Sequence, residues 1–80
     1  MIVKCKRVLL GNDHENSKWI VLQAYVDDLP QLTKTGTIST AALADGSVTI
    51  EGERQRLIDT VNEYHVRWLA AEAAIAALDE

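Results

Sequence analysis

The chain has 80 residues, with eight basic and twelve acidic side chains and a formal net charge of −4. A chain this short builds one hydrophobic core, so we expect a single domain over residues 1–80. The lone cysteine, Cys5, excludes an intramolecular disulfide. Together with two distant histidines, His14 and His65, it also excludes a zinc site of the usual kind.

Two strands are predicted in the first third of the chain, over residues 2–10 and 19–26. The stretch 11–18 between them has no apolar side chain and is typical of a solvated loop, so the strands are expected to pair as an antiparallel hairpin. Cys5 within the first strand is interpreted as a small buried apolar residue, with a reactive thiol as the alternative.

The second strand carries two different faces. Ile20, Leu22, Ala24 and Val26 alternate on one side and form an apolar face that belongs to the core. The opposite face contains Trp19, Val21, Gln23 and Tyr25, and two interpretations of it stay open. Either the middle of the chain folds over these side chains and buries them, or Trp19 and Tyr25 remain partly exposed as anchors for a partner.

The middle of the chain is the hardest part to interpret. Asp27-Asp28-Leu29-Pro30 is expected to end the second strand. Thr37-Ile38-Ser39 is a candidate for a short strand, and residues 40–44 form either a helical turn or the first arm of a hairpin. Asp45-Gly46 is a turn signal, and Val48 and Ile50 suit a short third strand near 47–51.

One long helix is predicted from about residue 53 to 78. Its apolar positions are spaced alternately by four and three residues, which keeps them on one stripe: Leu57, Val61, Tyr64, Trp68, Ala71, Ile75 and Leu78. The fold class is therefore α+β, a small antiparallel sheet packed against one C-terminal helix.

The predicted helix is longer than the sheet, roughly 39 Å against about 26 Å for a strand of eight residues. Its alanine-rich end should project beyond the sheet. It then either packs against a partner, with a homodimer as one version, or frays in solvent. The residues expected to mediate self-association are Trp68, Ala71, Ile75 and Leu78.

No combination of residues in the sequence suggests catalysis. The four glycines are scattered, Ser17 and His14 share a loop without any sign of a pocket, and Asp13-His14-Glu15 is typical of a solvated segment. We therefore expect a protein that is not an enzyme, with no cofactor and no metal ion.

The distribution of charge favours a protein partner. Residues 1–26 carry a balance of +2 and residues 27–80 a balance of −6, which should repel nucleic acid and attract basic protein surfaces. No secretory signal or membrane span is recognisable, so a cytoplasmic location is expected. The predicted partner-binding residues combine the aromatic face with an acidic rim: Asp13, Glu15, Trp19, Gln23, Tyr25, Asp27 and Asp28.

In size, acidity and architecture the chain resembles small phage-encoded anti-defence proteins, especially those of the anti-CRISPR type. The resemblance covers the whole chain in general character and involves no diagnostic motif, so no residue role carries over. It implies an inhibitor in a bacterial host cell that binds a subunit of a CRISPR surveillance complex and blocks its target-DNA site. The alternative is a small structural or assembly component of a phage particle that associates through its C-terminal helix.

Overall fold

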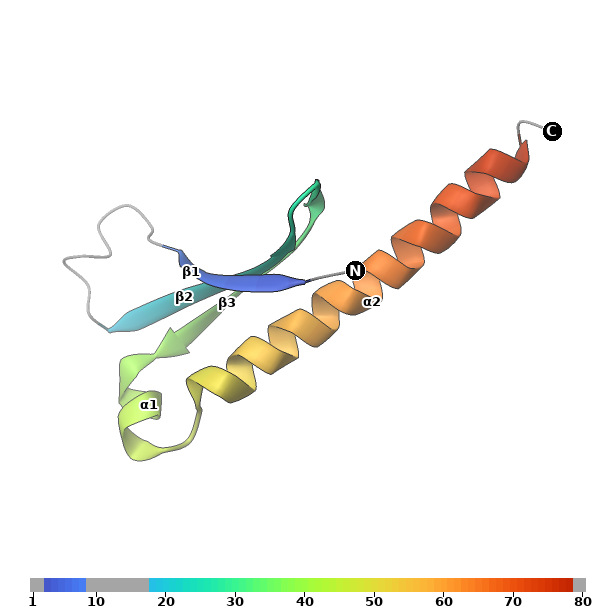
Figure 1. Ribbon diagram of the computed structural model, residues 1–80. Coiled ribbons are helices and arrows are strands. Elements are labelled where there is room, and N and C mark those ends of the chain that lie inside the picture. Colours follow the sequence, from blue (N-terminus) through green and yellow to red (C-terminus); the bar gives the residue numbers. More distant parts are fainter. Residues whose placement is uncertain (1–2, 9–17, 79–80) are drawn as a thin grey trace.

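The computed structural model describes residues 3–8 and 18–78 and contains three strands and two helices (Figure 1). In chain order these are β1 (Lys4–Val8), β2 (Trp19–Val26), β3 (Leu29–Ser39), α1 (Thr40–Asp45) and α2 (Ile50–Leu78). The strands form an antiparallel sheet in the order β1-β2-β3, and α2 runs across one face of it. The predicted α+β class is confirmed.

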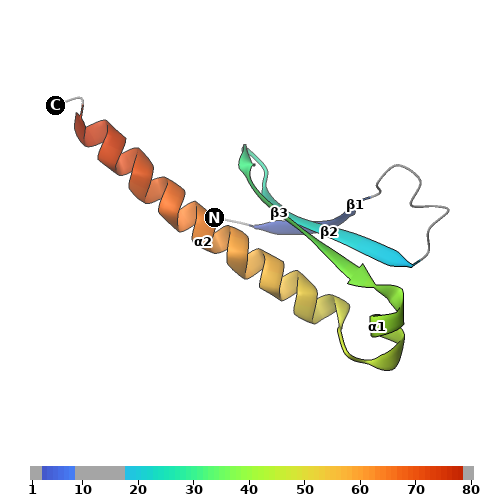
Figure 2. The same cartoon turned by 180° about the vertical axis from the view of Figure 1, so that it is seen from behind.

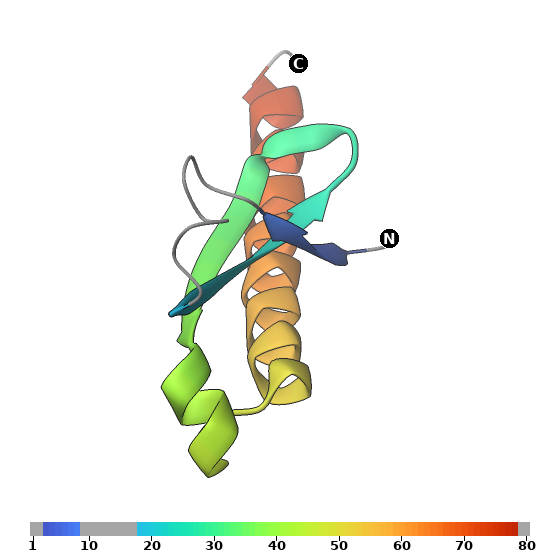
Figure 3. The ribbon, with the colours of Figure 1, turned by 90° about the vertical axis from the view of Figure 1, so that its left-hand side faces the viewer.

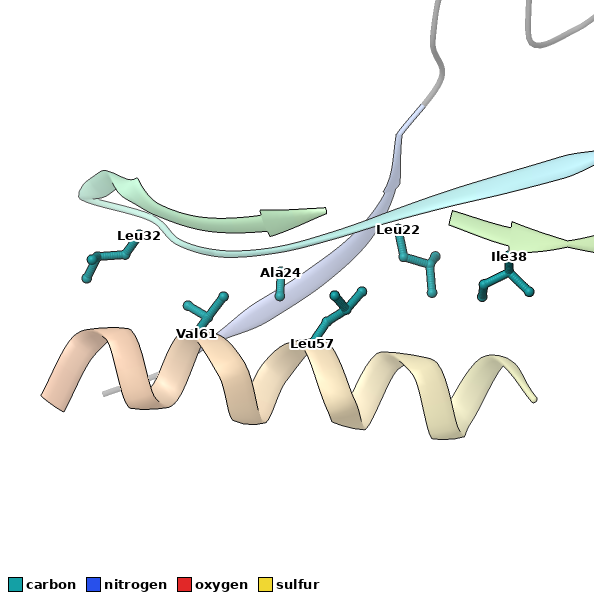
Figure 4. Packing of buried hydrophobic residues seen from close by; sticks show 6 residues of the cluster. All are labelled: Leu22, Ala24, Leu32, Ile38, Leu57 and Val61. Atoms are coloured by element: carbon teal, nitrogen blue, oxygen red, sulfur yellow. The ribbon is translucent and has the colours of Figure 1, made fainter. Parts of the chain in front are cut away.

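The core lies between the sheet and the first half of α2 (Figure 4). Alternation along β2 turns its apolar face towards the helix, and the i, i+4 spacing of the α2 residues turns theirs towards the sheet. The six buried residues of this core are Leu22, Ala24, Leu32, Ile38, Leu57 and Val61.

The helix packs closely against the sheet at Gly36 of β3. A Cβ atom at this position would lie 3.1 Å from Glu53 Oε1 and 3.2 Å from both Leu57 Cδ atoms. Contacts this short are tighter than ordinary van der Waals contact, so a Cβ atom here would push Glu53 and Leu57 back by a few tenths of an ångström. The packing of the two layers, rather than a special backbone angle, therefore favours glycine at position 36.

The prediction of a third strand near 47–51 was wrong, because the third strand is β3 at Leu29–Ser39. The stretch after Asp45 forms local hydrogen bonds instead of pairing with the sheet. The Ser47 amide donates to Asp45 Oδ1 at 2.8 Å, and the Gly52 amide donates to Thr49 Oγ1 at 3.0 Å. Side chains that bond nearby backbone in this way compete with strand formation, and α2 consequently begins at Ile50, three residues earlier than expected.

Of the two interpretations for residues 40–44, the helical turn is correct. The short helix α1 carries the chain from the end of β3 towards the start of α2 (Figure 3). It ends at Gly46, whose φ of 83° lies in the left-handed region, and the Gly46 amide donates back to the Leu43 carbonyl. This is the usual way in which a glycine terminates a helix.

The second half of α2 projects beyond the sheet, as predicted (Figure 2). The helix buries Leu57, Val61 and His65, whereas every residue from Leu69 to Leu78 is exposed. The molecule is correspondingly elongated, with extents of 56 × 26 × 15 Å. Within the described residues, no helix combines the length and the apolar character that crossing a membrane requires.

Candidate protein-binding surface

The sheet has an outer face, on the side opposite to α2. Directly opposed residues of antiparallel strands share a face, so the register identifies its members from the alternate positions of β2. They are Lys4, Lys6 and Val8 from β1, Trp19, Val21, Gln23 and Tyr25 from β2, and Thr33, Thr35, Thr37 and Ser39 from β3. No described helix lies on this side (Figures 1 and 2).

Trp19 lies at the beginning of β2 and is the most prominent apolar group of the outer face. The residue is 46% exposed. The middle of the chain does not fold over it, because residues 29–39 lie beside β2 in the sheet as β3. Of the two interpretations left open by the sequence, the structure therefore supports an exposed Trp19, while Val21 beside it is buried.

Tyr25 lies six residues further along the same face, about 20 Å from Trp19 at the usual rise of a strand. Its ring is partly buried, and the Lys6 ammonium lies 4.9 Å from the ring centroid, within the range of a cation–π interaction. The two side chains form a mixed aromatic and cationic surface at this end.

An exposed ion pair lies at the Tyr25 end of the outer face. Lys4 Nζ lies 2.5 Å from Asp27 Oδ2 across the β1–β2 edge. The hydrogen bond and the charge of Asp27 raise the pKa of Lys4 above its ordinary value. Asp28, in the turn that leads into β3, is exposed and lies beside Asp27. Both predicted acidic residues therefore lie where the outer face meets the β2–β3 turn.

The remaining predicted acidic residues, Asp13 and Glu15, lie outside the described residues. The same holds for Asp79 and Glu80. The described part of the chain carries eight acidic and eight basic side chains, so the net charge of −4 arises from these four acids alone. Residues 3–8 and 18–78 by themselves are electrically balanced.

The structure brings Trp19, Gln23 and Tyr25 together on one face, with Asp27 and Asp28 at its end. The face also includes flanking side chains that were not among the predicted site residues. They are Lys4 and Lys6 on one side and Thr33, Thr35 and Thr37 on the other. The alternating threonines of residues 33–37 were the available signal, because a period of two indicates one face of a strand.

The predicted self-association residues divide into two groups. Trp68 is partly buried against the core, and its ring stacks on His65 with centroids 6.0 Å apart. Ala71, Ile75 and Leu78 lie beyond the sheet, where Ile75 is 55% and Leu78 82% exposed. Val66 and Leu69 are also exposed and lie on other sides of the helix, off the apolar stripe predicted from the sequence.

Cys5 faces α2 and packs against the core, which supports its interpretation as a small apolar residue. Burial raises the pKa of its thiol, and the Arg54 guanidinium only partly counteracts this. A raised pKa lowers the fraction of thiolate, the reactive form. Among residues 3–8 and 18–78, no three His, Cys, Asp or Glu side chains are grouped as metal ligands would be.

Comparison of the chain with models of protein families, with curated proteins and with solved structures finds no match.

Proposed function

We propose that this chain is a non-enzymatic interaction protein that binds another protein through the outer face of its sheet. The observation that supports this most is the half-exposed Trp19 at the end of a face that no described helix covers. Large aromatic side chains at such positions contribute much of the binding free energy in protein interfaces.

The surroundings of Trp19 suit a protein partner. The outer threonines of β3 offer hydroxyl groups along the neighbouring strand. Asp27 and Asp28 supply charge at the far end. Protein interfaces combine apolar anchors with polar and charged surroundings, and the outer face offers both.

The more specific form of the proposal is an inhibitor of the anti-CRISPR type, acting in the cytoplasm of a bacterial host. It would bind a basic surface of a CRISPR surveillance complex and block target-DNA binding. This form is supported by the resemblance in size, charge and architecture. The basic nature of the target rests on the net charge of −4, whose excess acids lie outside the described residues.

The test measures target-DNA binding by purified CRISPR surveillance complexes in the presence of the chain. The wild-type chain is expected to displace DNA, with an effect that weakens as salt rises. Trp19→Ala is expected to weaken inhibition by about 30-fold, which corresponds to a hot-spot loss of about 2 kcal/mol.

Val66→Ala is the matched control, since it removes another exposed apolar side chain, 65% exposed, from α2 rather than from the sheet. It should inhibit as well as the wild type. Equal inhibition by wild type and Trp19→Ala would reject the outer face as the site. Absence of inhibition for every complex tested would reject the anti-CRISPR form of the proposal. The general proposal of a protein-binding outer face would then be retained only if the wild type binds other host proteins and Trp19→Ala does not.

A second function, a small assembly component of a phage particle, is favoured by the exposed end of α2. Assembly through apolar helix packing differs from the inhibitor function in two measurable ways. Its affinity should be insensitive to salt, and nucleic acid should not compete with it.

A further inference from the structure

We infer that the projecting end of α2 is a homodimer interface, in which two copies of this chain pair their helices in antiparallel orientation. This interface is separate from the outer face of the sheet and does not depend on the proposed function. It involves residues 69–78, called here the projecting segment, all of which are exposed in a single copy.

The apolar stripe of α2 continues beyond the sheet that it covers. Positions 57, 61, 64 and 68 pack against the core, and positions 71, 75 and 78 follow with the same alternation of four and three residues. This spacing is that of a coiled-coil seam. The second half of the seam has no partner in the described residues of the chain, although its period is unbroken.

The accessible surface of the chain is larger than that of a compact monomer, as expected for a chain that buries part of it against a second copy. A compact monomer of 8.8 kDa is expected to expose about 4,800 Å², whereas this chain exposes 5624 Å². The excess of about 800 Å² is comparable to the area that each partner buries in an interface of standard size, and the exposed projecting segment contributes part of it. The radius of gyration, 16.1 Å, likewise exceeds the value of about 12 Å expected for 80 residues.

The composition of the projecting segment suits a second copy of itself. Its only charged residue is Glu72, and six of its ten residues are alanine. Small side chains allow two helices to approach closely. A surface with almost no charge needs no complementary partner, so it can pair with an identical surface as a two-fold interface requires.

The fold determines the orientation of the pair. The sheet of each copy lies on the same side of α2 as the seam. In a parallel pair, both sheets would occupy the space between the two helices and would clash. In an antiparallel pair the projecting segments overlap and the two sheets lie at opposite ends, so only this arrangement brings the two seams together.

The test is the molecular mass of the full chain in solution, measured by sedimentation equilibrium over a range of concentrations. The wild type is expected to reach twice the mass of 8.8 kDa as concentration rises. Ile75→Glu and Leu78→Glu place a charge in the seam, so each should remain at the monomer mass with an unchanged far-UV circular dichroism spectrum. Ala73→Glu places the same charge on the opposite side of the helix and should leave the dimer intact.

Three results would overturn the inference. They are a wild type that stays monomeric at every concentration, a dimer that survives both seam substitutions, and a dimer that Ala73→Glu disrupts as strongly as Ile75→Glu.

The orientation of the two helices is tested with single-cysteine variants in a Cys5→Ser background. A disulfide between Ala71→Cys in one copy and Leu78→Cys in the other supports the antiparallel pair. Disulfides that form only between two Ala71→Cys chains and between two Leu78→Cys chains contradict it.

Discussion

Gly36 shows how a single residue sets the distance between the two layers of the fold. Its missing side chain lets Leu57, which is fully buried, and Glu53 lie directly over β3. Leu57 cannot move away without disturbing the core, and the Glu53 carboxylate is held by the Arg56 guanidinium, whose Nε donates to it at 2.8 Å. A side chain at position 36 therefore meets atoms that have little freedom to retreat.

We predict that Gly36→Val lowers the free energy of unfolding by about 1–3 kcal/mol, the usual cost of overpacking a core. The restricted backbone of valine offsets part of this cost through the unfolded state. Denaturant unfolding measures the change. Thr35→Val is the matched control, since it introduces the same side chain one residue earlier on the exposed outer face, and its effect should stay within about 0.5 kcal/mol. A Gly36→Val protein as stable as the wild type would contradict the close packing described here.

The start of α2 depends on a similarly local feature, the side chain of Thr49. Its Oγ1 accepts a hydrogen bond from the Gly52 amide at 3.0 Å, and its carbonyl accepts one from the Glu53 amide at 3.1 Å. The side-chain bond satisfies one of the amide groups that a helix leaves without partners in its first turn. Glu51 and Glu53 add negative charge at the same end, where the helix dipole favours it.

We predict that Thr49→Ala lowers the free energy of unfolding by about 1 kcal/mol, the typical value for loss of an N-terminal cap. Thr49→Ser keeps the hydroxyl group and should restore most of the lost stability. Thermal or denaturant unfolding of the three proteins gives the comparison. If the serine variant were as unstable as the alanine variant, the threonine methyl group rather than the hydrogen bond would be responsible.

Elements with a local and regular pattern could be predicted from the sequence, as β2 and α2 illustrate. β3 was misplaced because the positions that face α2 read Leu32, Lys34, Gly36 and Ile38, and only two of these four are apolar. Gly36 interrupts the alternation because the helix passes close above it, and that proximity depends on residues about twenty positions away in the chain. A contact so distant in sequence leaves no local periodic signal.

The candidate site was predictable to the same extent. Alternation along β2 placed Trp19, Gln23 and Tyr25 on one face, which the register bears out. The contributions of Lys6 and of the β3 threonines depend on which residue of one strand lies opposite which residue of another. Strand register is set by the fold as a whole, so a single strand read on its own could not reveal it.

At the scale of the whole molecule, the sheet and the first half of α2 share one small core. Leu57 and Val61 from the helix complete the contacts of the sheet residues, and both are fully buried. Neither layer has a second core of its own among the described residues. A domain of this length has a total stability of about 4–12 kcal/mol, so losing one central side chain removes a large share of it.

We predict that Leu57→Ala lowers the free energy of unfolding by about 2–5 kcal/mol and that the sheet and the helix unfold together. Far-UV circular dichroism follows α2, and Trp19 fluorescence in a Trp68→Phe background follows the sheet. The two transitions should coincide at a lower denaturant concentration than in the parent protein.

Leu78→Ala is the control, since it makes the same truncation at a residue that is 82% exposed. In the Ile75→Glu background, where the proposed dimer does not form, it should change stability by less than about 0.5 kcal/mol. Helical signal that persists after the Trp19 signal is lost would mean that α2 is stable without the sheet, because a helix held only by the shared core must unfold with it.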